Sequence, residues 1–299
     1  MEQTLQSLHK QYRTFRRLAA AELGLLVLAL AAVFYNKGAA FALLGVAVVF
    51  RLAVLRRRQR AYVSGVTRAN LQATLCPALG AEAPDETGGG AITPATLEQA
   101  RLIPFEAEPG GCLLRQGICG ERDGLAVAVC DATLGQRFEL VENGRKRVHF
   151  MSGVWLHITL PRDTGMDWRL LDRDALPQPI RRKFYGGLSG MERQELGGRW
   201  KESGLLFYTR VDSPSCPGDR VLNQVRSLMQ YTPGKLALSL RGDRLDLFLR
   251  ERLLALPVTV RKAPARERLV FDPLPELAYA MRIANVISEV SADSMGGKE

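Results

Sequence analysis

The hydrophobic pattern of the chain is strongest between residues 18 and 55. Two apolar segments, 18–35 and 38–55, are joined by the polar pair Asn36 and Lys37. Each segment has 18 residues, which as a helix would span about 27 Å, close to the ~30 Å hydrocarbon core of a bilayer. A soluble helical hairpin would keep a polar face on each helix, and neither segment has one. The pattern therefore predicts a transmembrane helical hairpin.

Two alternatives fit part of this pattern. An uninterrupted apolar run of this length also occurs in a helix buried in a soluble core. A secretory signal peptide has a short apolar region as well, followed by a small-residue cleavage site. The second apolar segment favours the hairpin over a signal peptide, because cleavage would leave that segment as a new anchor.

The charges around the hairpin predict its orientation. The arm before it carries Lys10, Arg13, Arg16 and Arg17 against the single acid Glu2. The basic residues at its exit have no acid among them: Arg51, Arg56, Arg57, Arg58 and Arg60. Short flanks rich in Lys and Arg stay on the cytoplasmic side. We therefore expect an inner-membrane protein with two spans, both termini in the cytoplasm and only the turn on the other side.

Two charged residues, Glu22 and Arg51, lie inside the apolar segments. Glu22 is 14 residues before Asn36 and Arg51 is 14 residues after Lys37, so an antiparallel hairpin places both at one depth. We predict an ion pair between them; the alternative is that each reaches the headgroups separately. Small residues at four-residue spacing, Ala20 with Gly24 and Gly38 with Ala42, predict close helix approach.

Beyond the hairpin the pattern predicts an α+β fold with a mainly antiparallel sheet and flanking helices, because strands follow one another without a βαβ rhythm. Thr93 or Thr96 is expected to cap a helix over 94–102. An Asn-Gly pair at 143–144 is typical of a hairpin turn. The expected strands are 125–130, 137–141, 147–160, 167–171, 204–210, 235–240 and 244–249, and the later helices are 219–230 and 275–290.

The same pattern divides the chain into consecutive parts. We expect a basic cytoplasmic arm at 1–17, the transmembrane hairpin at 18–55 and an amphipathic helix at 56–76. A linker rich in Pro and Gly at 77–95 would lead into a soluble α+β domain at 96–291, with a disordered tail at 292–299. Residues 172–203 give no clear prediction.

The net charge of +10 is concentrated around the hairpin. Residues 1–60 hold 10 basic and 2 acidic residues, whereas the remaining 239 hold 31 and 29. The soluble part is thus nearly neutral, which removes the electrostatic argument for a nucleic-acid partner. The expected partner is the bilayer itself, with Arg56, Arg57, Arg58 and Arg60 on anionic headgroups. Five cysteines without a framework of spacings indicate free thiols in a reducing compartment.

No motif predicts catalysis, a metal or a cofactor. The chain has no P-loop, and Ser189 in the Gly-rich stretch 187–191 lacks the final glycine of a nucleophile elbow. Close carboxylates, such as Asp243 with Asp246, are read as solvated, and all three tryptophans as core residues. The cysteines and histidines nearest to one another have no metal-ligand spacing, and Cys119 and Cys130 are expected to be packed: Cys112, Cys119, Cys130, His149 and His157.

Three stretches are similar to a known family: FMSGVW at 150–155, ESGLLFYTR at 202–210, and 223–249 with its helix and the hairpin LALSLRGDRLDLFL. Together with the two spans and the basic exit, they resemble the bacterial membrane proteins grouped as domain of unknown function 3137. The resemblance implies the architecture and supplies no catalytic residues. The sequence favours a membrane-anchored, non-enzymatic scaffold, sensor or binding module with a possible protein partner. The alternative is a membrane-associated enzyme acting on a lipid or small metabolite.

Overall fold

The computed structural model describes residues 2–106, 111–135, 140–142, 145–147, 150–187, 190–201, 203–212, 215–232, 235–255 and 263–296. The chain forms two compact units that interleave in sequence. The first, called the helical unit below, combines Met1–Thr74 with Ala255–Asp272. The second, called the sheet unit, combines Leu75–Leu254 with Pro273–Glu299. The expected division into consecutive parts misses this interleaving, because residues 255–272 belong with the N-terminal helices.

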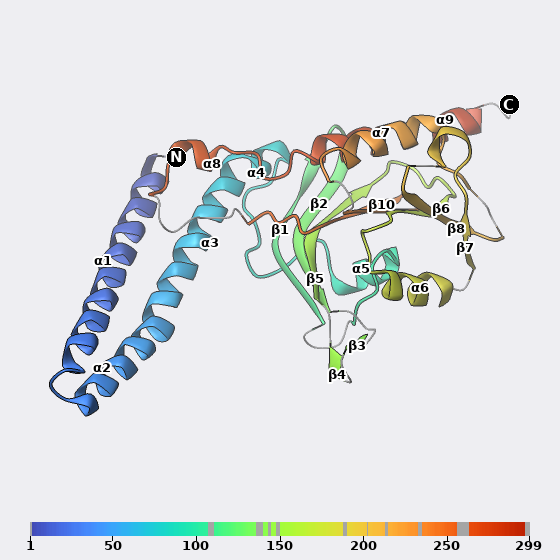
Figure 1. Ribbon diagram of the computed structural model, residues 1–299. Coiled ribbons are helices and arrows are strands. Elements are labelled where there is room, and N and C mark those ends of the chain that lie inside the picture. Colours follow the sequence, from blue (N-terminus) through green and yellow to red (C-terminus); the bar gives the residue numbers. More distant parts are fainter. Residues whose placement is uncertain are drawn as a thin grey trace. The chain divides into compact units, whose positions relative to one another are not determined.

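A pair of long antiparallel helices forms the helical unit (Figure 1). The first, α1, runs over Glu2–Ala32, and α2 begins at Lys37 and continues through Phe50. A π-helical turn, η1 (Arg51–Leu55), and α3 (Arg56–Ala73) continue α2 without a break. In the turn between α1 and α2, Asn36 Oδ1 accepts hydrogen bonds from the backbone nitrogens of Gly38 and Ala39 at 2.9 and 3.3 Å and so caps α2.

The two helices meet along a seam with seven-residue spacing. On α1 the buried residues are Leu8, Phe15, Glu22 and Ala29, and on α2 they are Ala40 and Ala47. A seven-residue period is the repeat of a left-handed coiled coil. The small residues expected at the contact, Ala20, Gly24, Gly38 and Ala42, are all exposed, so the prediction of which alanines and glycines face the partner helix was wrong. The four-residue spacing selected one side of each helix, whereas the seam follows the seven-residue repeat.

One helix of the described chain, Lys37–Ala78, is long and apolar enough to cross a membrane. The first expected span, 18–35, is shorter as a helix because α1 ends at Ala32 and the next residues form the turn. Any 18-residue stretch of α1 that ends at Ala32 therefore includes Arg16, Arg17 and Glu22. The structure shows an apolar helical hairpin with one helix of spanning length.

The basic end of the helical unit has a small core of its own. Leu8 of α1 packs with Tyr62, Val66 and Ala69 of α3 and with Leu269 of the short helix α8 (Arg266–Leu269). The rings of Tyr12 and Tyr62 lie 5.7 Å apart. The predicted amphipathic face of residues 56–76 is therefore confirmed, and it is covered by α1 and by the returning segment.

The sheet unit is built on one eight-stranded antiparallel sheet in the order β1-β2-β5-β10-β9-β6-β8-β7. This confirms the predicted α+β class with a large antiparallel sheet. A separate ribbon pairs β3 (Leu140–Glu142) with β4 (Arg145–Arg147), and the Asn-Gly pair between them lies outside the described residues. The eight strands are β1 (Cys112–Arg122), β2 (Leu125–Gly135), β5 (Phe150–Thr159), β6 (Asp167–Asp172), β7 (Met191–Gln194), β8 (Leu205–Arg210), β9 (Leu236–Arg241) and β10 (Arg244–Arg250).

Helices cover both faces of this sheet (Figure 1). One face packs on α5 (Pro94–Ala100), which Thr93 caps as predicted, and on α6 (Gln178–Gly187). On the other side of the sheet lie α7 (Asp219–Met229) and α9 (Leu277–Gly296). Burial on both faces explains why Val154 and Trp155, neighbours on β5 that point to opposite sides, are both fully buried. The three tryptophans are buried as predicted.

The segment 77–95 is not the free linker that its Pro and Gly content predicts. After α4 (Leu75–Ala78) it runs along the outer edge of β1, where the backbones of Asp85 and Gly117 exchange hydrogen bonds of 2.7 and 2.9 Å. Leu79 and Ile92 anchor it in the core. The glycines permit close backbone approach instead of mobility, and the segment covers an otherwise open strand edge.

Two further expectations change at the C-terminal side. Residues 172–203 contain α6, β7 and the 3₁₀ turn η2 (Gly198–Trp200). The expected disordered tail at 292–299 is helical through Gly296 as part of α9, and its last three residues lie outside the described chain.

Candidate functional site

A belt of exposed apolar side chains surrounds the hairpin between its turn and the Glu22–Arg51 level. Leu30, Phe34 and Phe41 are 68%, 85% and 75% exposed. The belt continues over both helices: Leu23, Val27, Leu28, Val33, Tyr35, Leu44, Val46, Val48, Val49 and Leu52. Single exposed apolar residues are ordinary, but a continuous patch of this kind marks a surface that something apolar covers.

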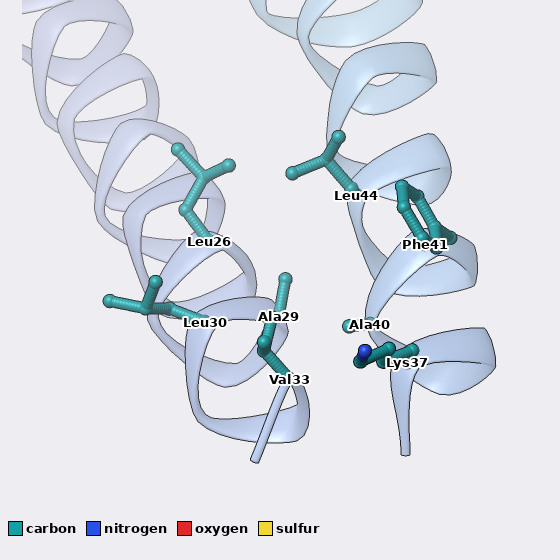
Figure 2. Close-up of a pocket in the computed structure, with 8 residues that line it drawn as sticks. All are labelled: Leu26, Ala29, Leu30, Val33, Lys37, Ala40, Phe41 and Leu44. Atoms are coloured by element: carbon teal, nitrogen blue, oxygen red, sulfur yellow. The ribbon is translucent and has the colours of Figure 1, made fainter. Parts of the chain in front are cut away.

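Within this belt a groove of about 260 Å³ lies between α1 and α2 (Figure 2). Ala29 and Ala40 form its floor, and both are almost fully buried in the contact between the helices. The larger walls come from both helices: Leu26, Leu30, Val33, Phe41 and Leu44. Lys37 is the single charged residue of the lining. The groove is therefore an apolar hollow with one cation at the end nearest the turn.

The structure brings Glu22 and Arg51 together. Their closest charged atoms, Glu22 Oε1 and Arg51 Nη1, lie 3.6 Å apart. The Glu22 side chain is only 12% exposed because it occupies the seam, whereas the Arg51 side chain is 65% exposed. Arg51 also begins the π-helical turn η1. The guanidinium thus covers the one acid that the seam buries.

The four arginines assigned to lipid headgroups lie on the first turns of α3 and are all exposed: Arg56, Arg57, Arg58 and Arg60. The sequence has no acidic residue between Glu22 and Glu82. These side chains can therefore meet anionic groups from outside the chain, as electrostatic contact with headgroups requires.

The sheet unit contains a polar row that the sequence did not predict. His157 on β5 lies opposite Asp246 on β10, and Asp246 Oδ1 accepts hydrogen bonds from Trp155 Nε1 at 3.0 Å and shares one with His157 Nδ1 at 2.9 Å. Asp246 was read as a solvated acid beside Asp243, but its side chain is 1% exposed. Only the register of three strands places it between an indole and an imidazole.

The row continues across the next strands. Asp246 lies opposite Ser239 on β9, and Ser239 lies opposite Arg169 on β6. Arg169 is fully buried, pairs with Asp167 and donates to the carbonyl oxygen of Trp168 at 3.0 Å. Ser239 Oγ has no hydrogen-bond partner within the described part of the chain. The row thus consists of paired charges beneath α5 rather than an open cluster of reactive groups.

Three side chains of this region form a relay of hydrogen bonds. Thr159 Oγ1 lies 3.4 Å from His157 Nε2, and the other ring nitrogen faces Asp246. Hydroxyl, imidazole and carboxylate in this order are the parts of a nucleophilic triad. The Thr159–His157 distance is at the limit of a hydrogen bond, however, and the two residues are only two apart on one strand.

The remaining candidates for chemistry are not brought together. Ser189 and His149 lie outside the described residues. The described residues contain no group of His, Cys, Asp and Glu arranged to hold a metal ion. Cys130 is buried as predicted, but Cys119 is exposed, and its sulfur accepts a 2.9 Å hydrogen bond from the Ala91 nitrogen.

Burial also controls the thiol chemistry. Desolvation raises the pKa of Cys76 and of Cys130, and Asp131 adds to the shift at Cys130. Desolvation and then Glu98 raise the pKa of Cys112 to about 11. These thiols carry little thiolate at neutral pH, so they are poor nucleophiles.

The comparisons with known proteins identify no family. No protein-family model matches the chain, and no curated protein matches it. Among solved structures, the crystal structure of the mycobacterial trehalose monomycolate transport factor A, TtfA, matches with a TM-score of 0.37 and 10% identity, over 75% of this chain and 94% of that chain. A similarity this low does not establish a shared fold and says nothing about the substrate or partner of this chain.

Proposed function

We propose that this protein is a two-span inner-membrane protein whose helical hairpin anchors an α+β binding module in the cytoplasm. The observation that supports this most directly is the apolar belt, because Leu30, Phe34 and Phe41 would face water in a soluble protein. Lipid covers such a surface at no cost, since acyl chains are as apolar as the side chains themselves.

The charges support one orientation of the hairpin. The exposed arginines Arg56, Arg57, Arg58 and Arg60 follow the apolar helix, and Arg16 and Arg17 precede the apolar part of α1. By the positive-inside rule both ends lie in the cytoplasm, where these arginines contact anionic headgroups. The 15 apolar-side positions from Leu18 to Ala32 on α1 are short for a span, so the turn residues 33–35 complete the crossing.

The sheet unit supports binding more than catalysis. Its buried charges are paired, and the described residues hold no metal cluster. The relay of Thr159, His157 and Asp246 is the observation that favours the enzymatic alternative. A fluorophosphonate probe tests it: the binding function predicts no covalent labelling of Thr159, whereas labelling that His157→Ala abolishes would support an enzyme.

Polar substitutions on the belt test the membrane anchor. Leu30 and Val49 are 68% and 65% exposed and touch no core. If the belt is in lipid, Leu30→Glu with Val49→Glu costs roughly 2.5–3.5 kcal/mol per charge near the bilayer centre, and the protein leaves the membrane on carbonate extraction. Gln59→Glu, on the exposed basic turn, is the matched control and should remain in the membrane fraction.

The opposite outcome is equally clear. If the belt faces water or a soluble partner, the double Glu variant fractionates like the wild type. A wild-type chain that carbonate removes from membranes would also contradict the anchor.

A further inference from the structure

We propose that the groove between α1 and α2 binds one acyl chain of an anionic phospholipid whose phosphate pairs with Lys37. The proposal rests on the membrane location proposed above and adds a specific ligand to it. It concerns the end of the hairpin at the turn, away from the arginines that follow α2.

The shape of the groove suits a hydrocarbon chain. Its volume is about 260 Å³, and apolar cavities of about 150 Å³ already hold benzene. The hollow exists because alanines, Ala29 and Ala40, occupy the seam where larger residues would fill the space. Leu26 and Leu44 stand at the end away from the turn, and Figure 2 shows Leu44 directed toward α1 across the hollow. Leucine and alanine walls offer dispersion contacts and no hydrogen bonds, which suits an acyl chain.

The charge at the other end selects the headgroup. Lys37 lines the groove beside the turn, and in Figure 2 its side chain reaches toward α1 across the base. No acidic residue occurs in the sequence from 23 to 81, so the ammonium needs an anion from outside this segment. Asn36 already accepts from the first backbone nitrogens of α2, which leaves Lys37 as the donor available to a phosphate.

The order of the two features along the hairpin matches a lipid. Lys37 is at the turn, where the headgroup region begins, and the apolar walls extend from Val33 to Leu26 on α1. Seven residues of helix rise about 10 Å toward the bilayer centre. A phosphate at Lys37 therefore directs its acyl chain down the groove, whereas a helix from a second copy would offer no anion at that level.

Native mass spectrometry of the full chain, delipidated in detergent and titrated with phosphatidylglycerol or phosphatidylcholine, tests the proposal. The wild type should retain one phosphatidylglycerol, with about fivefold weaker retention of phosphatidylcholine, as expected for one cation near a lipid surface. Lys37→Gln should remove this preference. Leu30→Trp narrows the groove and should reduce retention of both lipids.

The matched control is Leu28→Trp. Leu28 is 59% exposed against 68% for Leu30, lies on the same helix and does not line the groove, so its variant should bind as the wild type does. A Lys37→Gln variant that keeps the full preference would overturn the proposal. So would a stable dimer that Leu30→Trp disrupts, because a second copy would then fill the groove. A chain that carbonate extraction retains but that binds no lipid refutes this inference and leaves the membrane anchor intact.

Discussion

At the scale of single residues, two buried acids show how the protein keeps charge out of water. Glu22 lies in a helix seam and meets Arg51 at 3.6 Å; Asp246 lies under α5 and accepts from Trp155 and His157. The sequence predicted the first pair, because equal distances from a turn set equal depth in a hairpin. It could not predict the second, because Asp246 and His157 are 89 residues apart and meet only through strand pairing.

Charge exchange tests the role of the first pair. Glu22→Arg or Arg51→Glu puts two like charges close together at one depth and should lower the thermal stability of the protein in detergent. The double exchange Glu22→Arg with Arg51→Glu restores opposite charges and should recover most of the loss. If the double variant is no better than the worse single variant, the two residues act separately.

Removal of the second acid should cost more than removal of an exposed one. Asp246→Ala leaves the Trp155 and His157 donors without their acceptor inside the sheet unit, and we expect the free energy of unfolding to fall by about 3 kcal/mol. Urea unfolding followed by tryptophan fluorescence measures it. Asp243→Asn, at an exposed position in the adjacent turn, should change stability by less than about 0.5 kcal/mol. Equal effects would show that Asp246 is not held as described.

At the scale of elements, local pattern predicted the strands and helices but not what covers the sheet edge. Alternation and turn residues indicated β9, β10 and α7 nearly to the residue. The segment 77–95 has the composition of a linker, yet it is fixed by backbone contact with β1. Composition cannot distinguish a glycine that gives freedom from one that permits close approach. The heptad seam of α1 and α2 was missed for a similar reason, since both helices are apolar on every side.

The glycine at the β1 edge provides the test at this scale. A Cβ at Gly120 would overlap the carbonyl oxygen of Leu79, whereas a Cβ at Gly197 would meet nothing. We expect Gly120→Ala to lower the free energy of unfolding by roughly 1–3 kcal/mol, as other overpacked sites do. It should also expose the edge of β1 and promote aggregation.

The control, Gly197→Ala, should be neutral or slightly stabilising, because it only restricts the unfolded chain. Denaturant unfolding and light scattering of both variants give the comparison. A Gly120→Ala protein as stable and soluble as wild type would mean that segment 77–95 does not pack on the edge.

At the scale of the whole molecule, the helical unit is completed by residues far along the chain. Asn70 Nδ2 donates to the carbonyl oxygens of Leu269 and Phe271 at 3.2 and 2.7 Å, and Leu269 is buried in the core at the basic end. The sequence gave no sign of this return, because a charged stretch beside it reads as an exposed loop. A division read from composition alone therefore separates segments that fold together.

Thiol labelling probes the sheet unit and the start of its chain as folded bodies. Cys119 and Cys216 are exposed, whereas Cys76 and Cys130 are buried. Because burial raises the pKa of Cys76 and Cys130, both react only after unfolding. Cys112, with its pKa raised to about 11, should react slowly at pH 7.5 and faster as pH rises toward that value, since the thiolate fraction grows tenfold per pH unit. Mass spectrometry after timed alkylation measures these rates; rapid labelling of Cys130 in the native protein would contradict the fold.

The central claim, a membrane hairpin with both ends in the cytoplasm, is tested most directly by cysteine accessibility in intact cells. Cys112, Cys119 and Cys216 are replaced by Ser, and the two buried thiols are kept. A single new cysteine is then introduced as Lys37→Cys at the turn or as Arg162→Cys at an exposed position of the sheet unit. The account predicts that a membrane-impermeant maleimide labels Lys37→Cys in intact cells and labels Arg162→Cys only after permeabilisation. Labelling of Arg162→Cys from outside, or protection of Lys37→Cys from the reagent, would contradict it.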